Sequence, residues 1–329
     1  MTPLRGNLGA FKVHILLSLL LLSLILGLFG SLFGGCLSFL PYGYNDFFVH
    51  LPRSEQFCVS SPDGETTYWT DDRGARIIDG EDKEAPVYAF GESQLLEIFP
   101  DTSGQGHALR SLYPKKPLII HGAPNNGPFE TVEYLKYVLR TTNPEHIVIG
   151  FNFGTDVFRI IPGWKIKKFV SLTSDELPKV MSFPFWYDLK IAVGVLKGKF
   201  FTAKKPNLER TRNYYNSRKK IIRTNFQTFI NQLTKAAKPV NSKIDFVFFP
   251  PYWAYSQKED TSYFEETIGI EFKNFVCDGV ILNQLLVANT YIARFPKTLS
   301  TEKLFTYDRR HFRTETLKFE SRETYCAKL

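Results

Sequence analysis

Four residues in three short segments have the types and spacing needed for nucleophilic catalysis. Ser93, in the sequence GESQ, follows an apolar run directly, and Asp308 and His311 are separated by two residues near the C-terminus. An acid and a histidine at this spacing can meet on one turn, where the carboxylate fixes the imidazole tautomer and stabilises the imidazolium. His311 would then take the proton from Ser93 as an acyl bond forms. Asn152, in the sequence GFN, supplies an amide at the end of another apolar run.

These residues need a scaffold that brings strand ends together, and the apolar pattern predicts one. Buried strands are expected at 87–90, 118–121, 146–150 and 244–249, and helices from 128, around 226–233 and at 264–276. Strands that alternate with helices predict an α/β fold with a parallel sheet and crossover helices. Because parallel strands end at one edge of the sheet, Ser93 and Asn152 are expected at that edge.

In this order the segments resemble the SGNH/GDSL hydrolase superfamily, over about residues 86–315. The family has a G-D-S block after the first strand, a glycine block after the second, G-x-N-D after the third and D-x-x-H near the end. The resemblance implies a flavodoxin-like three-layer sandwich and a serine esterase or O-acyltransferase activity. It also implies that Ser93 is the nucleophile, Asp308 the orienting acid and His311 the base.

The same resemblance implies an oxyanion hole. Its donors would be the backbone N–H of Ser93, the N–H of Gly127 and the side chain of Asn152, with Gly122 as the alternative glycine because the loop 122–127 aligns either way. Fixed donors at a developing oxyanion are usually the largest catalytic contribution, and losing one costs roughly 3–4 kcal/mol.

Two positions depart from the family pattern. Glu92 replaces the aspartate before the serine, and Phe153 replaces the aspartate after the asparagine. The first changes how the loop is supported, and the second removes a carboxylate that is not part of the proton relay. Neither departure deletes a reacting group.

Each of these residues also has a structural alternative. Ser93 could cap the next helix, Asn152 could be a turn residue, and Gly127 could simply precede the helix that starts at Pro128. His311 could pair with an acid for structural reasons alone. Four further residues could either line the site or pack in the core: His121, Tyr252, Trp253 and Tyr255.

The N-terminal segment predicts a membrane anchor. Residues 13–40 contain no charged side chain, and a bilayer-spanning helix needs roughly 20 apolar residues. Arg5 and Lys12 precede the span, which favours a cytoplasmic N-terminus and an exported main domain. The alternatives are a cleaved signal peptide, a lipoprotein anchored through Cys36, and a buried helix of a soluble core.

The chain after residue 40 is expected to contain a lead-in at 41–85 with a short hairpin, then one domain at 86–329 with an insertion at about 158–224. The 329 residues are 43% apolar, which excludes a mainly disordered protein. The mean hydropathy of −0.17 excludes a polytopic membrane protein. Much of the net charge of +8 lies at 204–223. This basic segment is either a solvated helix face or a contact for anionic lipid or an acidic polysaccharide; a nucleic-acid partner is not expected.

Cofactor and metal signatures are missing from the sequence. No G-x-x-x-x-G-K-[ST], G-x-G-x-x-G or H-E-x-x-H occurs, so no cofactor or metal is expected. The cysteines Cys36, Cys58, Cys277 and Cys326 form no C-x-x-C pair. One disulfide among the last three would suit an oxidising compartment, with its pairing left open.

The predicted function is hydrolysis or transfer of acyl esters, most simply acetyl esters, of a cell-envelope or exported polysaccharide. The alternative is a non-catalytic protein of the same fold that binds a polysaccharide or assists in its assembly. Its aromatic and basic surfaces would then contact the glycan or a membrane partner.

Overall fold

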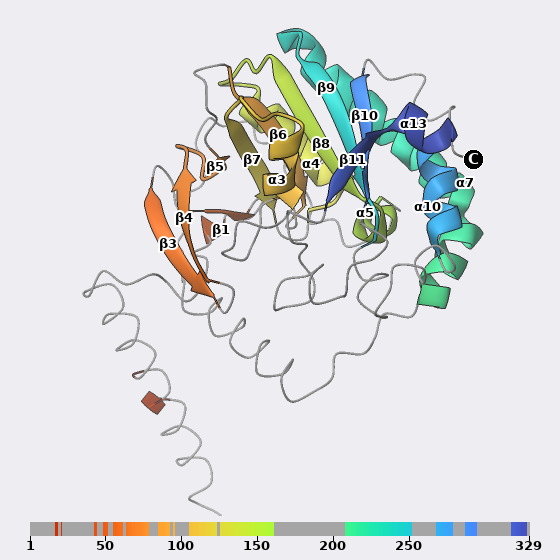
Figure 1. Ribbon diagram of the computed structural model, residues 1–329, viewed down its shortest axis with the longest axis horizontal. Helices are drawn as coiled ribbons and strands as arrows, with labels where there is room; N and C mark the ends of the chain where they lie inside the picture. Colours follow the sequence, from red (N-terminus) through yellow and green to blue (C-terminus); the bar gives the residue numbers. More distant parts are fainter. Residues whose placement is uncertain are drawn as a thin grey trace, which may run out of the picture.

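The computed structural model contains a nine-stranded mixed sheet with helices, which confirms the α/β class (Figure 1). The structure describes residues 17–18, 21, 43–44, 49–51, 55–61, 64–78, 85–92, 95, 105–123, 126–160, 208–251, 268–278, 287–294 and 317–327.

Five parallel strands form the centre of the sheet, in the order β7-β6-β8-β9-β10. They are β6 (Val87–Glu92), β7 (Leu118–Ala123), β8 (His146–Asn152), β9 (Lys243–Phe249) and β10 (Val287–Arg294). The first four of these confirm the strands predicted from the apolar runs. Parallel strands with both faces covered read as continuous apolar runs, and the last six residues of β9 are all buried.

Antiparallel strands extend both edges of this parallel centre. Beyond β7 lie β5 (Arg76–Ile78), β4 (Gly64–Thr70) and β3 (Gln56–Ser61), and beyond β10 lies β11 (Lys318–Ser321). β3 and β4 form a hairpin in the segment 41–85, which therefore contributes three strands to the main sheet. β1 (Gly43–Tyr44) and β2 (Val49–His50) form a separate two-stranded sheet.

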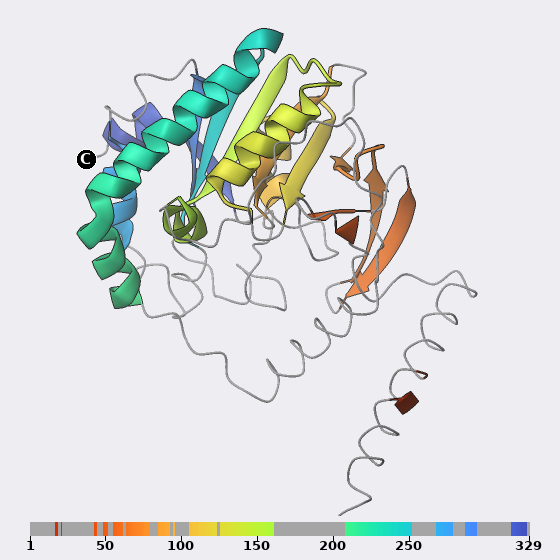
Figure 2. The same cartoon turned by 180° about the vertical axis from the view of Figure 1, so that it is seen from behind.

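Helices lie on both sides of the sheet. α4 (Pro128–Val138), α7 (Leu208–Ala237) and α10 (Ile270–Val276) cover one face (Figure 2). α3 (Gln105–Ala108), followed by the 3-10 turn η1 (Leu109–Ser111), and α13 (Arg322–Ala327) lie on the other side (Figure 1). α5 (Phe153–Arg159) follows β8 directly, and the turn η2 (Lys238–Val240) follows α7.

Phenylalanine dominates the core between the sheet and α7. Phe151 of β8 contacts Phe226 of α7, Phe248 of β9 and Phe275 of α10, with ring centroids 5.1 to 5.7 Å apart. All four side chains are at most 2% exposed. Burying each of them contributes roughly 2 kcal/mol, so this cluster is a main reason why α7 and α10 pack on the sheet.

The predicted membrane anchor lies almost wholly outside the described residues, because only residues 17, 18 and 21 of the segment 13–40 are described. In the part of the chain that the structure describes, no helix is both long enough and apolar enough to cross a bilayer.

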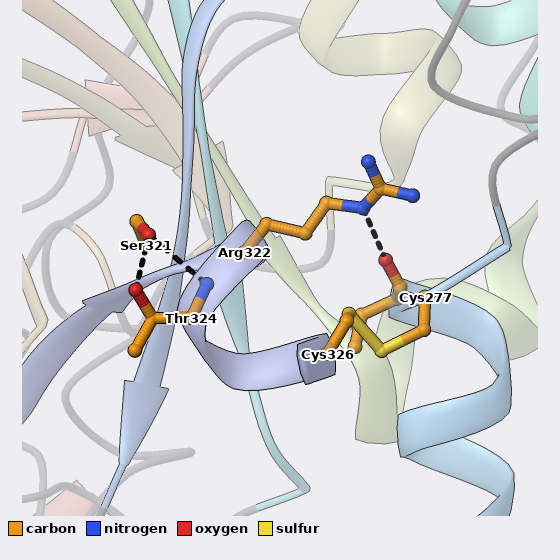
Figure 3. The surroundings of a disulfide bond; sticks show 6 residues. Cys277, Ser321, Arg322, Thr324 and Cys326 are labelled. Atoms are coloured by element: carbon orange, nitrogen blue, oxygen red, sulfur yellow. Dashed lines mark hydrogen bonds between the residues drawn. A yellow bond between two sulfur atoms is a disulfide. The ribbon is translucent and has the colours of Figure 1, made fainter. Parts of the chain in front are cut away.

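A disulfide joins Cys277, at the end of α10, to Cys326 in α13 (Figure 3). Next to it, Nε of Arg322 donates a hydrogen bond to the carbonyl oxygen of Val276 at 2.8 Å. The bond therefore ties the C-terminal helix to the helix layer on the other side, and no cysteine of the described residues is free.

Candidate functional site

The described residues include two of the five that were predicted to form the site. Gly127 precedes α4, and Asn152 is the last residue of β8. The predicted triad of Ser93, Asp308 and His311 lies outside the described residues, although Glu92, immediately before the serine, ends β6.

The carboxyl ends of β6 and β8 meet at the point where the strand order reverses. β6 pairs with β7 on one side and with β8 on the other, and open α/β sheets bind ligands in the crevice at such a switch point. Gly91 of β6 lies close to Gly150 of β8, because a Cβ atom on Gly91 would lie only 3.2 Å from the Gly150 carbonyl oxygen. Glycine at position 91 therefore lets the two strand ends approach closely.

Asn152 is buried and acts as the N-cap of α5. Its side-chain oxygen accepts a hydrogen bond from the N–H of Gly154 at 3.0 Å, and its own N–H donates to Oδ2 of Asp156 at 2.7 Å. The sequence offered only a turn residue as the structural alternative for Asn152, so this helix cap is a role that it did not predict. The cap is compatible with a donor role, because an oxygen that caps the helix directs the amide NH₂ group away from the helix.

Gly127 is the N-cap of α4, and its N–H is already engaged. It donates to Oε2 of Glu130 at 3.1 Å, which is half of a capping box. A carboxylate beside this N–H would repel an oxyanion, so Gly127 could serve in an oxyanion hole only after Glu130 moves. Gly122, the alternative glycine, lies inside β7 opposite Gly91.

Arg159, at the end of α5, connects the three strand-end segments. Its Nη1 atom lies 3.0 Å from Oε2 of Glu92 and donates a hydrogen bond to the carbonyl oxygen of Asn126 at 2.6 Å. A Cβ atom on Gly127 would approach Cβ of Arg159 to 2.9 Å. One guanidinium therefore holds the residue before Ser93 and the glycine loop after β7 against α5.

Among the residues that the structure describes, three acidic side chains surround Arg159. Glu92 and Asp156 are each 4% exposed, and Glu130 lies beside them. Burial raises the pKa of Asp156 well above its ordinary value, and the Glu92 carboxylate raises it further, while Arg159 and the N–H of Asn152 oppose the shift. Burial also raises the pKa of Glu130. Buried acids with raised pKa values can retain a proton at neutral pH and then donate it, as acids in active sites do.

Sequence reasoning missed Arg159, Asp156 and Glu130. The available signal was an acid and an arginine three residues apart directly after Asn152, in the sequence FGTDVFR. The departure at Phe153 also has a structural explanation: its side chain is fully buried and packs against Phe272 of α10. The carboxylate that accepts a hydrogen bond from the Asn152 N–H belongs to Asp156, one turn later.

His121 belongs to the core rather than to the lining of the site. It is 1% exposed and stacks on Phe90 with ring centroids 4.8 Å apart, and its Nδ1 lies 3.3 Å from the Tyr134 hydroxyl. Burial lowers the pKa of His121 to about 3, so the ring is neutral.

The described part of the basic segment, residues 208–223, forms the first turns of α7. Arg212 pairs with Glu271 at 2.8 Å, Arg223 pairs with Asp278 at 2.5 Å, and Arg218 lies over the Tyr214 ring. These contacts to Glu271 of α10, to Asp278 just after α10 and along α7 give three of the cations a structural partner.

The remaining predictions concern residues outside the described ranges or ligands. The aromatic residues Tyr252, Trp253 and Tyr255, together with Lys204 and Lys205, lie outside the described residues. Within the described ranges, no group of three or more His, Cys, Asp or Glu side chains could hold a metal ion.

Comparison with known proteins provides no relative for this chain: no family model, no curated protein and no solved structure matches it.

Proposed function

We propose that this chain is a serine-dependent acyl-ester hydrolase or O-acyltransferase of the SGNH type. Ser93 is the nucleophile, His311 the base and Asp308 the acid that orients His311. Acetyl esters of a cell-envelope or exported polysaccharide are the proposed substrates. Water as acceptor would make the chain an esterase, and a sugar hydroxyl would make it a transferase.

The observation that carries this proposal is the convergence of three strand-end segments at one switch point. Counted along the chain, the parallel strands have the order 2-1-3-4-5, which is the flavodoxin-like order. Glu92, directly before Ser93, is linked through Arg159 to the loop carrying Gly127, and Asn152 begins the helix that ends with Arg159. An SGNH site requires a serine, a glycine and an asparagine segment at the switch point of the sheet, and the segments around Ser93, Gly127 and Asn152 are the proposed ones.

The disulfide supports the proposed export of the domain. Disulfides such as Cys277–Cys326 persist mainly in oxidising compartments. The segment it closes also carries Asp308 and His311, so we propose that the bond limits the freedom of the segment that supplies the base.

Glu130 is the observation that favours the second candidate function, a non-catalytic polysaccharide-binding or assembly protein. Its carboxylate holds the Gly127 N–H, and two more acids lie nearby. An acid-rich strand edge disfavours an oxyanion, whereas carboxylates bind sugar hydroxyls well. In this candidate function Ser93 has no chemical role.

The deciding experiment is a hydrolysis assay on the purified full chain with a chromogenic acetyl ester and an acetylated polysaccharide. Wild-type protein should release acetate, and Ser93→Ala should lose activity by about a thousandfold or more. A phosphonate inhibitor should label Ser93, with the adduct located by mass spectrometry. Ser217→Ala, which removes an exposed hydroxyl on α7, is the matched control and should keep full activity.

Equal activity in wild type and Ser93→Ala would end the assignment of Ser93. A wild-type chain that binds the polysaccharide, releases no acetate and takes up no phosphonate would support the binding function instead.

A further inference from the structure

A second buried acid lies at the opposite, amino-terminal edge of the parallel strands. Asp245 of β9 is 0% exposed. It accepts hydrogen bonds from the Tyr113 hydroxyl at 2.5 Å and the Asn289 amide at 3.0 Å, and Nε2 of His146 lies 2.8 Å from it. Burial acts to raise the pKa of Asp245, but these hydrogen bonds outweigh it and hold the pKa below its ordinary value. The carboxylate is therefore ionised at neutral pH.

The ionised acid fixes the orientation of its neighbours. Because Asp245 can only accept, Nε2 of His146 carries a proton and donates it, and in the neutral form of the ring Nδ1 is then an acceptor. Within the described residues, no hydrogen bond reaches Nδ1 of His146 or the side-chain oxygen of Asn289. Both acceptors are thus held in place without a hydrogen-bond donor among the described residues.

These two side chains line a pocket of about 720 Å³. Pockets that bind small molecules are typically about 300–1,000 Å³. Lys116 and Lys243 bring two positive charges to the lining, and Glu145 brings one negative charge. Lys243 is exposed and forms no ion pair with any described residue. The lining therefore favours a ligand with a negative charge.

Asparagine amides form much of the remaining polar lining. Besides Asn289, Asn143 and Asn241 contribute to the pocket. Asn241 has φ 52°, in the left-handed region, and its N–H bonds the Lys238 carbonyl oxygen at 3.2 Å. An amide can both donate to and accept from a hydroxyl group, so three of them suit a hydroxylated ligand.

We propose that this pocket binds a sugar-sized molecule that carries a carboxylate or a phosphate. The lysine ammonium groups neutralise the anion, and the amides together with Nδ1 of His146 bond the hydroxyl groups. The pocket lies at the end of the strands opposite Glu92 and Asn152, so its ligand does not depend on the chemistry proposed for Ser93.

The test is calorimetric titration of the full chain with glucuronate, glucose 6-phosphate, glucose and inorganic phosphate. At least one acidic sugar should bind, with glucose and inorganic phosphate each about tenfold weaker or more. The stronger of the two acidic sugars identifies the anionic group. Lys243→Gln should weaken binding of that sugar about tenfold, and His146→Gln, which can still donate to Asp245, should weaken it severalfold.

Lys220→Gln, which removes an exposed lysine of α7, is the matched control and should leave the affinity unchanged. Equal binding of glucose and the acidic sugars would overturn the anionic part of the proposal. Equal binding of inorganic phosphate and glucose 6-phosphate, with no binding of glucuronate, would overturn the sugar part. Equal effects of Lys243→Gln and Lys220→Gln, or no binding of any probe at about 10 mM, would overturn the site itself.

Discussion

Asp245 and Asp156 are two buried acids at opposite edges of the same parallel sheet. Their side chains are almost equally shielded, with relative exposures of 0% and 4%. The pKa of Asp245 nevertheless lies below its ordinary value, whereas the pKa of Asp156 lies well above it. Burial alone therefore does not decide whether a carboxyl group in this fold is ionised.

The difference comes from the groups that surround each acid. Asp245 has three side-chain partners, all of which donate to it or can do so. Asp156 accepts from one backbone N–H and lies near Glu92, whose negative charge disfavours a second one. Asp245 is thus electrostatically satisfied, whereas among the described residues the carboxyl ends of the strands hold an excess of acid of the kind found at functional sites.

The largest effect is expected from breaking the satisfied cluster. Asp245→Ala leaves three side chains without their shared acceptor and opens a cavity, so it should lower the free energy of unfolding by about 3–5 kcal/mol. Urea denaturation followed by circular dichroism measures this loss. Asp72→Ala removes an acid whose side chain is 70% exposed and should change stability by less than about 0.5 kcal/mol. Similar losses in both variants would contradict the importance of the cluster.

At the carboxyl ends of the parallel strands, Arg159→Met should have the next largest effect on the free energy of unfolding. Methionine keeps much of the packing volume but removes the Arg159 cation from the buried Glu92, which should cost about 2–3 kcal/mol at pH 7. The control is Lys136→Met, which breaks an exposed pair with Glu133 and should cost about 0.5 kcal/mol or less. A cost for Arg159→Met no greater than that of the control would show that the guanidinium does not hold these segments together.

Gly127→Ala should have a smaller effect, because its cost is steric. The new Cβ atom would lie 2.9 Å from Cβ of Arg159 and 2.9 Å from Oε2 of Glu130, so the destabilisation should be about 1–2 kcal/mol. Gly150→Ala is the matched glycine control, because its closest new contacts are 3.4 Å and ordinary. The prediction fails if denaturation gives the same stability change for the two alanines.

The smallest effects, with opposite signs, should appear in the pH dependence of stability of two variants, Asp156→Asn and Asp245→Asn. Because the pKa of Asp156 is raised, its contribution to stability is present below the ordinary value of 3.8 and is lost as the pH rises through the raised pKa. Asp156→Asn should therefore remove a decline of stability with rising pH. Because the pKa of Asp245 is lowered, its contribution is present above 3.8 and is lost as the pH falls through the lowered pKa. Asp245→Asn should therefore remove a loss of stability that the wild type shows as the pH falls into the acidic range.

Urea titrations of wild type and both variants, from about pH 3 to pH 8, separate these two slopes. Two variants whose stability differences from wild type change with pH in the same direction would contradict the contrast between the edges.

Much of the fold was predictable because its signals are local. The apolar run at 87–90 predicted β6, Pro128 predicted the start of α4, and the run at 244–249 predicted β9. The antiparallel strands β4 and β5 were harder to predict, since their sequences are mixed and their place in the sheet depends on pairing with β7.

The candidate site was predictable only in part. Asn152 does lie at the carboxyl end of its strand, as the alternation of strands and helices predicted, but both Asn152 and Gly127 are engaged in helix caps. Glu92 was recognised as a departure from the family pattern, yet nothing near it in the sequence pointed to its partner Arg159. The roles of Ser93, Asp308 and His311 remain predictions.

The sequence by itself determined four of the five central strands, because burial of an apolar run depends on neighbours along the chain. Only the tertiary structure decided which polar side chains meet. Glu92 and Arg159 are 67 positions apart, and His146 and Asp245 are 99 positions apart. Strand order and register bring such residues together, and these partners set the direction of each pKa shift and the charge of each edge.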